Sequence, residues 1–532
     1  MKNKRILAMF VVMAITVAMI PVLVFADEEI TETEETKTEE TSETKETEAT
    51  EPETNDEEEV SVSEKGDLPE QADKEDAKDA ITGTSGNIKW SFNETDGTFT
   101  LSPKKKNTKV AMPKFEYNSN PWGSYLWRIK KLVISKGITS ISDYAFNGTP
   151  YMTSVSIPSG VKTIGKGAFL RSGLKSVSIP KTVTSIGESA FNDCKDLETV
   201  KIYGAASIGM AAFCDCGSLK TLSLGSKVKS IGTSAFSRCS SLKSVMIPAS
   251  VTKWGESAFQ ECAALTSVKL TSGLKSIGNK AFSQCGLTSI SIPGSVSIID
   301  EYAFSQCREL VEVYVGTGVK TIGSAAFYKC TKLKNIDLPY SIQKIDARAF
   351  DSCESFTNFY IPYGVTEVEA LAFMNCTNLE TVTYPSSVKN IGLNQFINCT
   401  SIKQINITKD LYETCYWAWK DCPNSLNVNE LKDNSLTVGV KKAKVKYKKL
   451  RKRNQTIAPS KLFKISPNDQ KALFVKVKGK KKITINKYTG KVTVKKKLKK
   501  GSYKVRVKVL VTGNETYKAS DWKTVTIKIK VK

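Results

Sequence analysis

The chain has 532 residues, which is too long for one ordinary domain and predicts several regions. Its net charge of +24 combines two opposed segments, with 24 acidic residues against 5 lysines over 27–80 and 32 Lys/Arg against 3 acidic residues over 441–532. Histidine is absent. This excludes Ser-His-Asp and Cys-His catalysis and removes the commonest zinc ligand. We therefore expect no enzyme activity, no cofactor and no metal or catalytic site.

The first 80 residues read as an export signal followed by a stalk. Lys2, Lys4 and Arg5 precede an apolar run over 6–25. The run is followed by Ala26, a small residue of the kind found at signal-peptide cleavage sites. This pattern predicts a secretory signal peptide over 1–26, and we expect membrane contact only through this peptide before cleavage. Residues 27–80 have a net charge of −19 and almost no large apolar side chains, which predicts a disordered acidic stalk.

The centre of the chain repeats one sequence motif about a dozen times. Anchor aromatics recur every 22 or 23 residues, at Phe146, Phe169, Phe191, Phe213, Phe236, Phe259, Phe282, Phe304, Phe327, Phe350, Phe373 and Phe396, with Trp419 in the same place. A fixed short period is the signature of a solenoid, in which each turn is too small to bury its own core. The spacing predicts a solenoid of about thirteen turns over 129–428.

Each turn holds two short apolar pairs. Val177 and Ile179 alternate with polar residues, which suits a short strand with one face inward, and proline often follows it. A second pair, such as Val228 and Ile231, predicts another short strand. The fold class is therefore mainly β, with strands stacked into parallel sheets.

The repeated pattern "IPxxVTxIGxxAFxxCxxLxxV" resembles the BspA-like leucine-rich repeats of bacterial surface proteins over 129–422. The stretch "GNIKWSFNETDGTFTLS" at 86–102, with a hairpin turn at Asp96-Gly97, resembles the cap that precedes such repeats, so we expect a β-hairpin cap over 81–128. The resemblance implies a right-handed leucine-rich-repeat solenoid and a surface-exposed, non-catalytic binding protein, often linked to adhesion.

Eleven of the 13 cysteines lie three residues after an anchor aromatic, and only Cys214 and Cys415 fall outside this series. One interpretation is a metal-thiolate string or a disulfide framework, which is common in exported proteins. The other is a ladder of buried free thiols, one per turn. Zinc needs four ligands in one place, whereas these are spread evenly, so we predict a structural ladder.

Residues 441–532 predict a small antiparallel β-sandwich. "SYKVRVKVLV" and "TVTIKIKVK" alternate apolar and basic residues, and Thr489-Gly490 supplies a turn. The segment resembles Lys-rich terminal modules of exported Gram-positive proteins. The outward basic residues predicted to hold an anionic cell-wall polymer are Lys504, Arg506, Lys508, Lys528 and Lys530. No aromatic platform accompanies them, so we expect no nucleic-acid partner; a solvated basic surface without a partner is the alternative.

One outward column of the first strand in each turn changes character along the solenoid. Nearly all early turns carry a small hydroxyl residue or lysine there, and the column ends at Thr383 and Asn406. In turns nine to eleven it becomes aromatic and acidic. The resulting candidate ligand residues are Glu312, Tyr314, Asn335, Asp337, Tyr340, Asn358, Tyr360 and Tyr363. Exposed tyrosine beside amide and carboxylate groups suits a protein or glycan ligand; tyrosines scattered without function are the alternative.

These features predict a secreted, wall-associated cell-surface protein of the adhesion type. Its solenoid would bind a protein or glycan on a host or neighbouring cell, and its basic end would bind the anionic wall. The alternatives are a structural wall spacer without a specific ligand and an accessory of a carbohydrate-active enzyme.

Overall fold

The computed structural model describes residues 80–419, 422–423, 425–467 and 469–532. The predicted signal peptide and all but the last residue of the predicted stalk lie outside this range. Among the described residues, no helix is long and apolar enough to cross a membrane.

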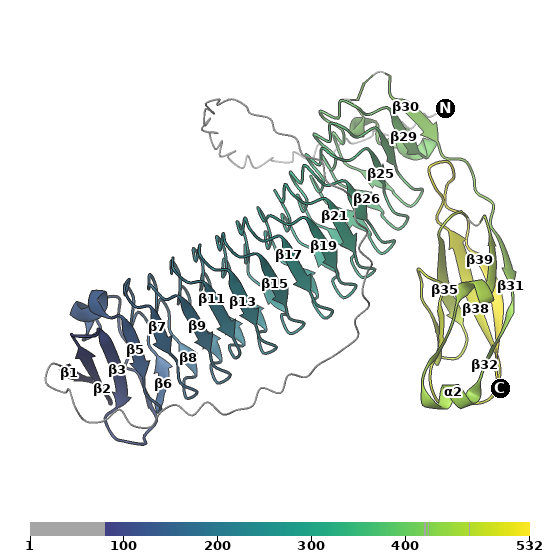
Figure 1. The fold of residues 1–532 in the computed structure, drawn as a ribbon. Helices are drawn as coiled ribbons and strands as arrows, with labels where there is room; N and C mark the ends of the chain where they lie inside the picture. The colour runs from purple at the N-terminus through teal and green to yellow at the C-terminus, as the bar shows by residue number, and fades with distance from the viewer. Residues whose placement is uncertain (1–79, 420–421, 424, 468) are drawn as a thin grey trace, which may run out of the picture. The chain divides into compact units, whose positions relative to one another are not determined.

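A hairpin cap closes the first end of the solenoid (Figure 1). Strands β1 (Ala80–Ser85), β2 (Ile88–Asn93) and β3 (Thr98–Pro103) pair antiparallel, and β3 then pairs parallel with the first solenoid strand. The turn at Asp96-Gly97 forms as predicted, with Gly97 in the left-handed region at φ 72°. The indole of Trp122 stacks 5.8 Å from the first anchor ring, Phe146, so the cap covers the apolar core that the first turn would expose.

The leading strand of each turn has the predicted alternation. In β9, Val177 and Ile179 are buried while Ser176 and Ser178 are exposed, and the register runs in parallel from turn to turn. The leading strands are β5 (Lys131–Ile134), β7 (Ser154–Ser156), β9 (Ser176–Ile179), β11 (Thr199–Ile202), β13 (Thr221–Leu224), β15 (Ser244–Ile247), β17 (Ser267–Leu270), β19 (Ser289–Ile292), β21 (Glu312–Val315), β23 (Asn335–Asp337), β25 (Asn358–Tyr360), β27 (Thr381–Thr383), β29 (Gln404–Ile407) and β30 (Asn427–Glu430).

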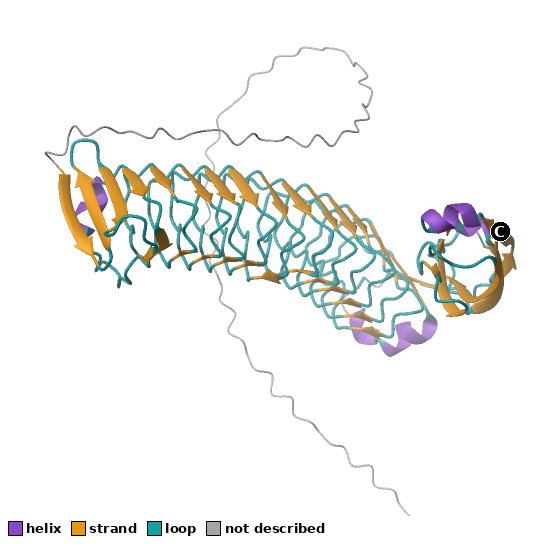
Figure 2. Ribbon diagram, turned by 90° about the horizontal axis from the view of Figure 1, so that it is seen from below, coloured by secondary structure: helices purple, strands orange, loops and turns teal. Residues whose placement is uncertain are grey.

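A second row of strands runs along the opposite side of each turn (Figure 2). Most are only two residues long, and most bury their last residue, usually isoleucine. The exceptions are β4 and β16, whose last residues Ala111 and Trp254 are exposed and partly buried, respectively. They are β4 (Val110–Ala111), β6 (Ile138–Ile141), β8 (Thr163–Ile164), β10 (Ser185–Ile186), β12 (Ser207–Ile208), β14 (Ser230–Ile231), β16 (Lys253–Trp254), β18 (Ser276–Ile277), β20 (Ile298–Ile299), β22 (Thr321–Ile322), β24 (Lys344–Ile345), β26 (Glu367–Val368) and β28 (Asn390–Ile391). The predicted two-strand turn is confirmed.

The bend that carries the anchor aromatic forms a third hydrogen-bonded column, which the sequence did not predict. Ser189 and Asp193, two residues before and after Phe191, have left-handed φ values of 52° and 57°. The N–H groups of Ser189, Phe191 and Asp193 all donate to carbonyl oxygens of the next turn at 2.8–2.9 Å. Left-handed backbone is costly for residues other than glycine. Here the bonds to the next turn offset that cost, and the same geometry recurs along the solenoid.

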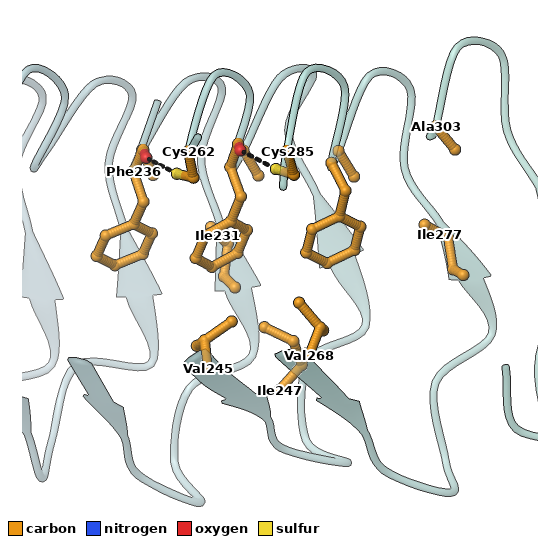
Figure 3. Packing of buried hydrophobic residues seen from close by; sticks show 14 of the residues in the cluster. Ile231, Phe236, Val245, Ile247, Cys262, Val268, Ile277, Cys285 and Ala303 are labelled. Atoms are coloured by element: carbon orange, nitrogen blue, oxygen red, sulfur yellow. Dashed lines mark hydrogen bonds between the residues drawn. The ribbon is translucent and has the colours of Figure 1, made fainter. Parts of the chain in front are cut away.

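Stacked anchor rings and thiols fill the interior behind this bend. The rings of Phe191 and Phe213 lie 5.0 Å apart and 2° from parallel. The ladder thiols from Cys194 to Cys399 each donate to the carbonyl oxygen of the anchor in the preceding turn. Figure 3 shows this for Cys262, which donates to Phe236 at 3.2 Å, and for Cys285, which donates to Phe259 at 3.1 Å. The twelve cysteines from Cys194 to Cys415 are free and buried, and Cys422 is partly buried. The prediction of a structural thiol ladder is confirmed.

The last turns close the solenoid with aromatic and amide groups. The helix α1 (Lys409–Thr414) leads to Trp419, whose ring stacks 6.1 Å from Phe396. The outward positions Thr383 and Asn406 are buried, contrary to the predicted alternation. Asn406 donates to Thr383 at 2.9 Å and accepts from Asn429 of β30 at 2.9 Å. The polar side chains of neighbouring strands thus bury one another and form one another's hydrogen bonds.

The C-terminal domain has its own core, separate from that of the solenoid. One sheet has the order β32 (Lys442–Val445), β39 (Lys523–Val531), β38 (Gly501–Val511) and β35 (Ala472–Lys478). A second has the order β33 (Gln455–Ile457), β37 (Val492–Val494) and β36 (Ile483–Ile485), and β31 (Thr437–Val440) pairs with β34 (Phe463–Ser466). The helix α2 (Tyr447–Lys452) buries Leu450. Pairing is antiparallel as predicted, except that β32 and β39 are parallel.

Candidate functional site

The outward residues that become aromatic and acidic in the later turns lie in a shallow hollow of about 340 Å³ over β21, β23 and β25. Six of the eight predicted ligand residues line it, namely Glu312, Tyr314, Asn335, Asp337, Asn358 and Tyr360. The amine-bearing Lys334 and the apolar floor of Val313, Ile336, Phe356 and Phe359 complete the lining. The hollow therefore combines one aromatic rim with carboxylate, amide and ammonium groups.

Hydrogen bonds fix the acidic edge of this hollow. The Tyr314 hydroxyl donates to Glu312 Oε2 at 2.8 Å, and Asn335 Nδ2 reaches Glu312 Oε1 at 3.5 Å. The Tyr314 side chain is 53% exposed, so its ring face remains open to solvent. Its hydrogen bond to the Glu312 carboxylate raises the pKa of the Tyr314 hydroxyl above its ordinary value. The hydroxyl thus stays protonated and keeps the ring oriented at neutral pH.

The hollow forms where the leading sheet is interrupted. β23 pairs with β21 but not with β25, which begins a separate sheet. The Phe359 ring lies under this gap, 5.0 Å from Phe350 and 4.8 Å from Phe373. Other turns have aliphatic residues at the positions of Phe356 and Phe359. These two bulky residues distinguish the turns of the hollow in the sequence, but they were not among the predicted site residues.

Three of the predicted tyrosines are less available than Tyr314. Tyr340 and Tyr363 do not line the hollow; the Lys471 amine lies 5.5 Å from the Tyr340 ring centroid, and Tyr363 is partly buried. Tyr360 is also partly buried, and burial raises the pKa of its hydroxyl well above the ordinary value. Tyr314 is therefore the exposed aromatic of the candidate site.

The predicted wall-binding residues share one face of the C-terminal domain. Lys504, Arg506 and Lys508 lie on β38, and Lys528 and Lys530 lie on β39, all exposed. A groove of about 1130 Å³ crosses part of this face. It is lined by Lys504, Arg506 and Lys528 of the predicted set, together with Lys478, Lys480 and Lys481, which the prediction did not include.

Cys214, outside the regular thiol series, lies in a local ion pair. Arg238 donates to both oxygens of Asp215 at 2.6 and 3.0 Å, and the Cys214 thiol donates to Asp215 at 3.2 Å. Burial and the neighbouring Asp215 carboxylate raise the pKa of the Cys214 thiol to about 12. Because the thiolate is the nucleophile, Cys214 is held in its unreactive form. In the described part of the chain, no group of three or more Cys, Asp or Glu could hold a metal ion.

The stacked parallel strands, the regular thiol and phenylalanine ladders and the uniform turns define a leucine-rich-repeat solenoid. BspA type leucine-rich repeat regions match residues 124–206, 203–311 and 297–426, more than half of the chain. The chain therefore belongs to the BspA-type leucine-rich repeat family, as the sequence resemblance predicted.

Comparison with solved structures finds leucine-rich-repeat proteins of bacteria. A leucine-rich repeat protein from Bacteroides ovatus is 23% identical, with 66% of this chain and 100% of that chain covered and a TM-score of 0.46. A leucine rich cell surface protein from Faecalibacterium prausnitzii is 23% identical over 61% and 94% of the two chains, with a TM-score of 0.33. The pneumococcal vaccine antigen PcpA is 18% identical over 66% and 94%, with a TM-score of 0.38. A search of curated proteins found no match.

Proposed function

We propose that this protein is an exported, non-catalytic surface protein whose solenoid binds a protein or glycan through the hollow over β21, β23 and β25. The observation that carries the proposal is the exposed Tyr314, oriented by Glu312 and set beside Asn335 and Asp337 in one hollow. A rigid aromatic ring gives contact area at low cost in conformational entropy. Carboxylate and amide groups around it supply directed hydrogen bonds.

Substitution of Tyr314 by serine, the residue used at this position in several earlier turns, tests the site. A glycan and matrix-protein array first identifies a ligand for residues 80–431, and calorimetry then compares affinities. We expect Tyr314→Ser to cost about 1–3 kcal/mol of binding free energy, roughly a 5- to 150-fold rise in Kd. Its ring is exposed, so circular dichroism should be unchanged.

Tyr203→Ser is the matched control, because Tyr203 is also about half exposed, at 49%, but belongs to an early turn. Its affinity should equal that of the unmodified chain. Equal loss in both variants would place the ligand elsewhere on the solenoid. The absence of any saturable ligand would favour the structural-spacer alternative.

The same proposal assigns retention on an anionic cell wall to the basic C-terminal domain. Its separate core supports testing residues 432–532 and 80–431 as two fragments. We expect the basic fragment to be retained on isolated Gram-positive walls at 0.1 M salt and released at 1 M, because the Debye length falls from about 10 Å to about 3 Å. Sedimentation with walls measures this, and retention that ignores salt, or that is equal for the two fragments, would contradict it.

A further inference from the structure

The outer face of the sheet β32–β39–β38–β35 brings lysines of separate strands into direct opposition. Lys442 of β32 pairs in register with Lys528 of β39, and Lys528 pairs with Lys504 of β38. Three lysines thus form one row across three neighbouring strands. Directly opposed side chains in a sheet have β-carbons only about 5 Å apart.

Further cations surround this row on the same face. Lys444 is paired with Lys530, and Arg506 with Lys478. None of these side chains forms an ion pair with a described residue. The ion pair found in the described part of the domain joins Lys518 and Asp433, neither of which belongs to this set. The positive charges on this face are therefore not neutralised by acidic side chains among the described residues.

This arrangement lowers the stability of the domain on its own. Like charges placed directly opposite in a sheet are destabilising. Solubility alone is served equally well by charges of mixed sign, so it does not account for opposed lysines in three adjacent strands. A bound polyanion would remove the repulsion.

We propose that this face binds a linear polyanion that carries one phosphodiester per repeating unit and has no bases to be read. The proposal rests on the proposed wall attachment and names its surface and its ligand class. A flexible chain of repeated anions matches cations that recur about every 5 Å across strands and about every 6.7 Å along them.

The residue types favour phosphate over a nucleic acid with stacked bases. Lysine is a compact point charge on a flexible stem, which suits phosphates whose orientation varies along a polymer. Proteins that bind single-stranded nucleic acid add exposed aromatic rings for base stacking. The tyrosine that lines this groove, Tyr503, is partly buried, and its hydroxyl donates to the Lys499 carbonyl at 2.7 Å. The described lining therefore has no fully exposed aromatic ring.

The test uses the full chain with the double substitution Lys504→Gln and Lys528→Gln. The control is Lys448→Gln with Arg451→Gln, which removes the same charge from two exposed side chains of α2. Long-chain inorganic polyphosphate is the probe, with affinity measured by calorimetry and thermal unfolding at low salt. We expect the sheet variant to lose at least tenfold in affinity and to unfold a few degrees higher, while the α2 variant loses less than about threefold and gains no stability.

The outcomes separate this surface from the wider attachment role. Equal loss of affinity in both variants, or no rise in the unfolding temperature of the sheet variant, would overturn the proposed surface. Tenfold tighter binding of single-stranded DNA or of heparin than of polyphosphate would overturn the ligand class. If wall retention is salt-sensitive but unaffected by the sheet variant, the attachment role stands and this surface fails. If polyphosphate binding is lost selectively but walls retain neither protein, the surface stands and the attachment role fails.

Discussion

The free energy of unfolding of the solenoid should fall steeply as the pH rises from 9 to 12. Burial raises the pKa of the Cys307 and Cys399 thiols from an ordinary 9.0 to about 12. In this range the unfolded chain releases the thiol protons while the folded chain retains them, so the unfolded state is favoured as pH rises. Each such thiol lowers stability by about 1.4 kcal/mol per pH unit.

Over the three-unit window each of these two thiols accounts for about 4 kcal/mol, and together they equal the whole stability of a typical domain. Burial also raises the pKa of Cys330, Cys353 and Cys376 well above the ordinary value, which adds to the effect. We therefore expect unfolding within this window rather than gradual loosening.

The double variant Cys307→Ser and Cys399→Ser isolates the thiol contribution, because Ser172 already occupies the same position in an earlier turn. Urea unfolding followed by circular dichroism at pH 8, 9, 10 and 10.5 gives the slope of stability against pH. The variant's slope should be shallower by about 2.7 kcal/mol per pH unit. An unchanged slope would mean that the thiols are not the groups responsible.

Replacement of one anchor aromatic in the middle of the solenoid should be the most damaging single substitution. Phe236 is fully buried, and its ring lies 5.3 Å from Phe213 and 5.1 Å from Phe259. Phe236→Ala removes the ring and leaves a cavity that two stacked neighbours cannot fill, at a cost of about 3–5 kcal/mol. Urea unfolding measures the loss.

Met246→Ala is the control, because Met246 is 52% exposed at an outward position of the next turn. It should change stability by less than about 0.5 kcal/mol. Since each turn contacts only its neighbours, hydrogen exchange in Phe236→Ala should rise mainly in the turns around Phe236. A loss below about 1 kcal/mol, or exchange that rises evenly along the solenoid, would contradict a core built from stacked rings.

Local alternation and the fixed period were sufficient to predict the turn. Val177 and Ile179 alternate with polar residues, which predicts a strand with one buried face. Because the repeat length is nearly constant, equivalent residues of successive turns lie side by side, and this sets the register between neighbouring strands. The thiol ladder was also predictable, because a single cysteine per turn at one offset from the anchor can only form a column. Alternation along the leading strands placed six of the eight candidate ligand residues in one hollow, whereas its apolar floor of Phe356 and Phe359 was not predicted.

The sequence by itself determined that this protein is a capped repeat solenoid with one thiol per turn, followed by a basic β-domain, because those features depend on spacing along the chain. The tertiary structure alone decided three others. The left-handed bends at Ser189 and Asp193 carry no glycine signal, since bonds to the next turn hold them. The burial of Asn406 depends on Asn429 of the neighbouring strand. The opposition of Lys442 to Lys528 depends on a parallel pairing between β32 and β39, at the two ends of the domain. No local pattern encodes a register between segments so far apart.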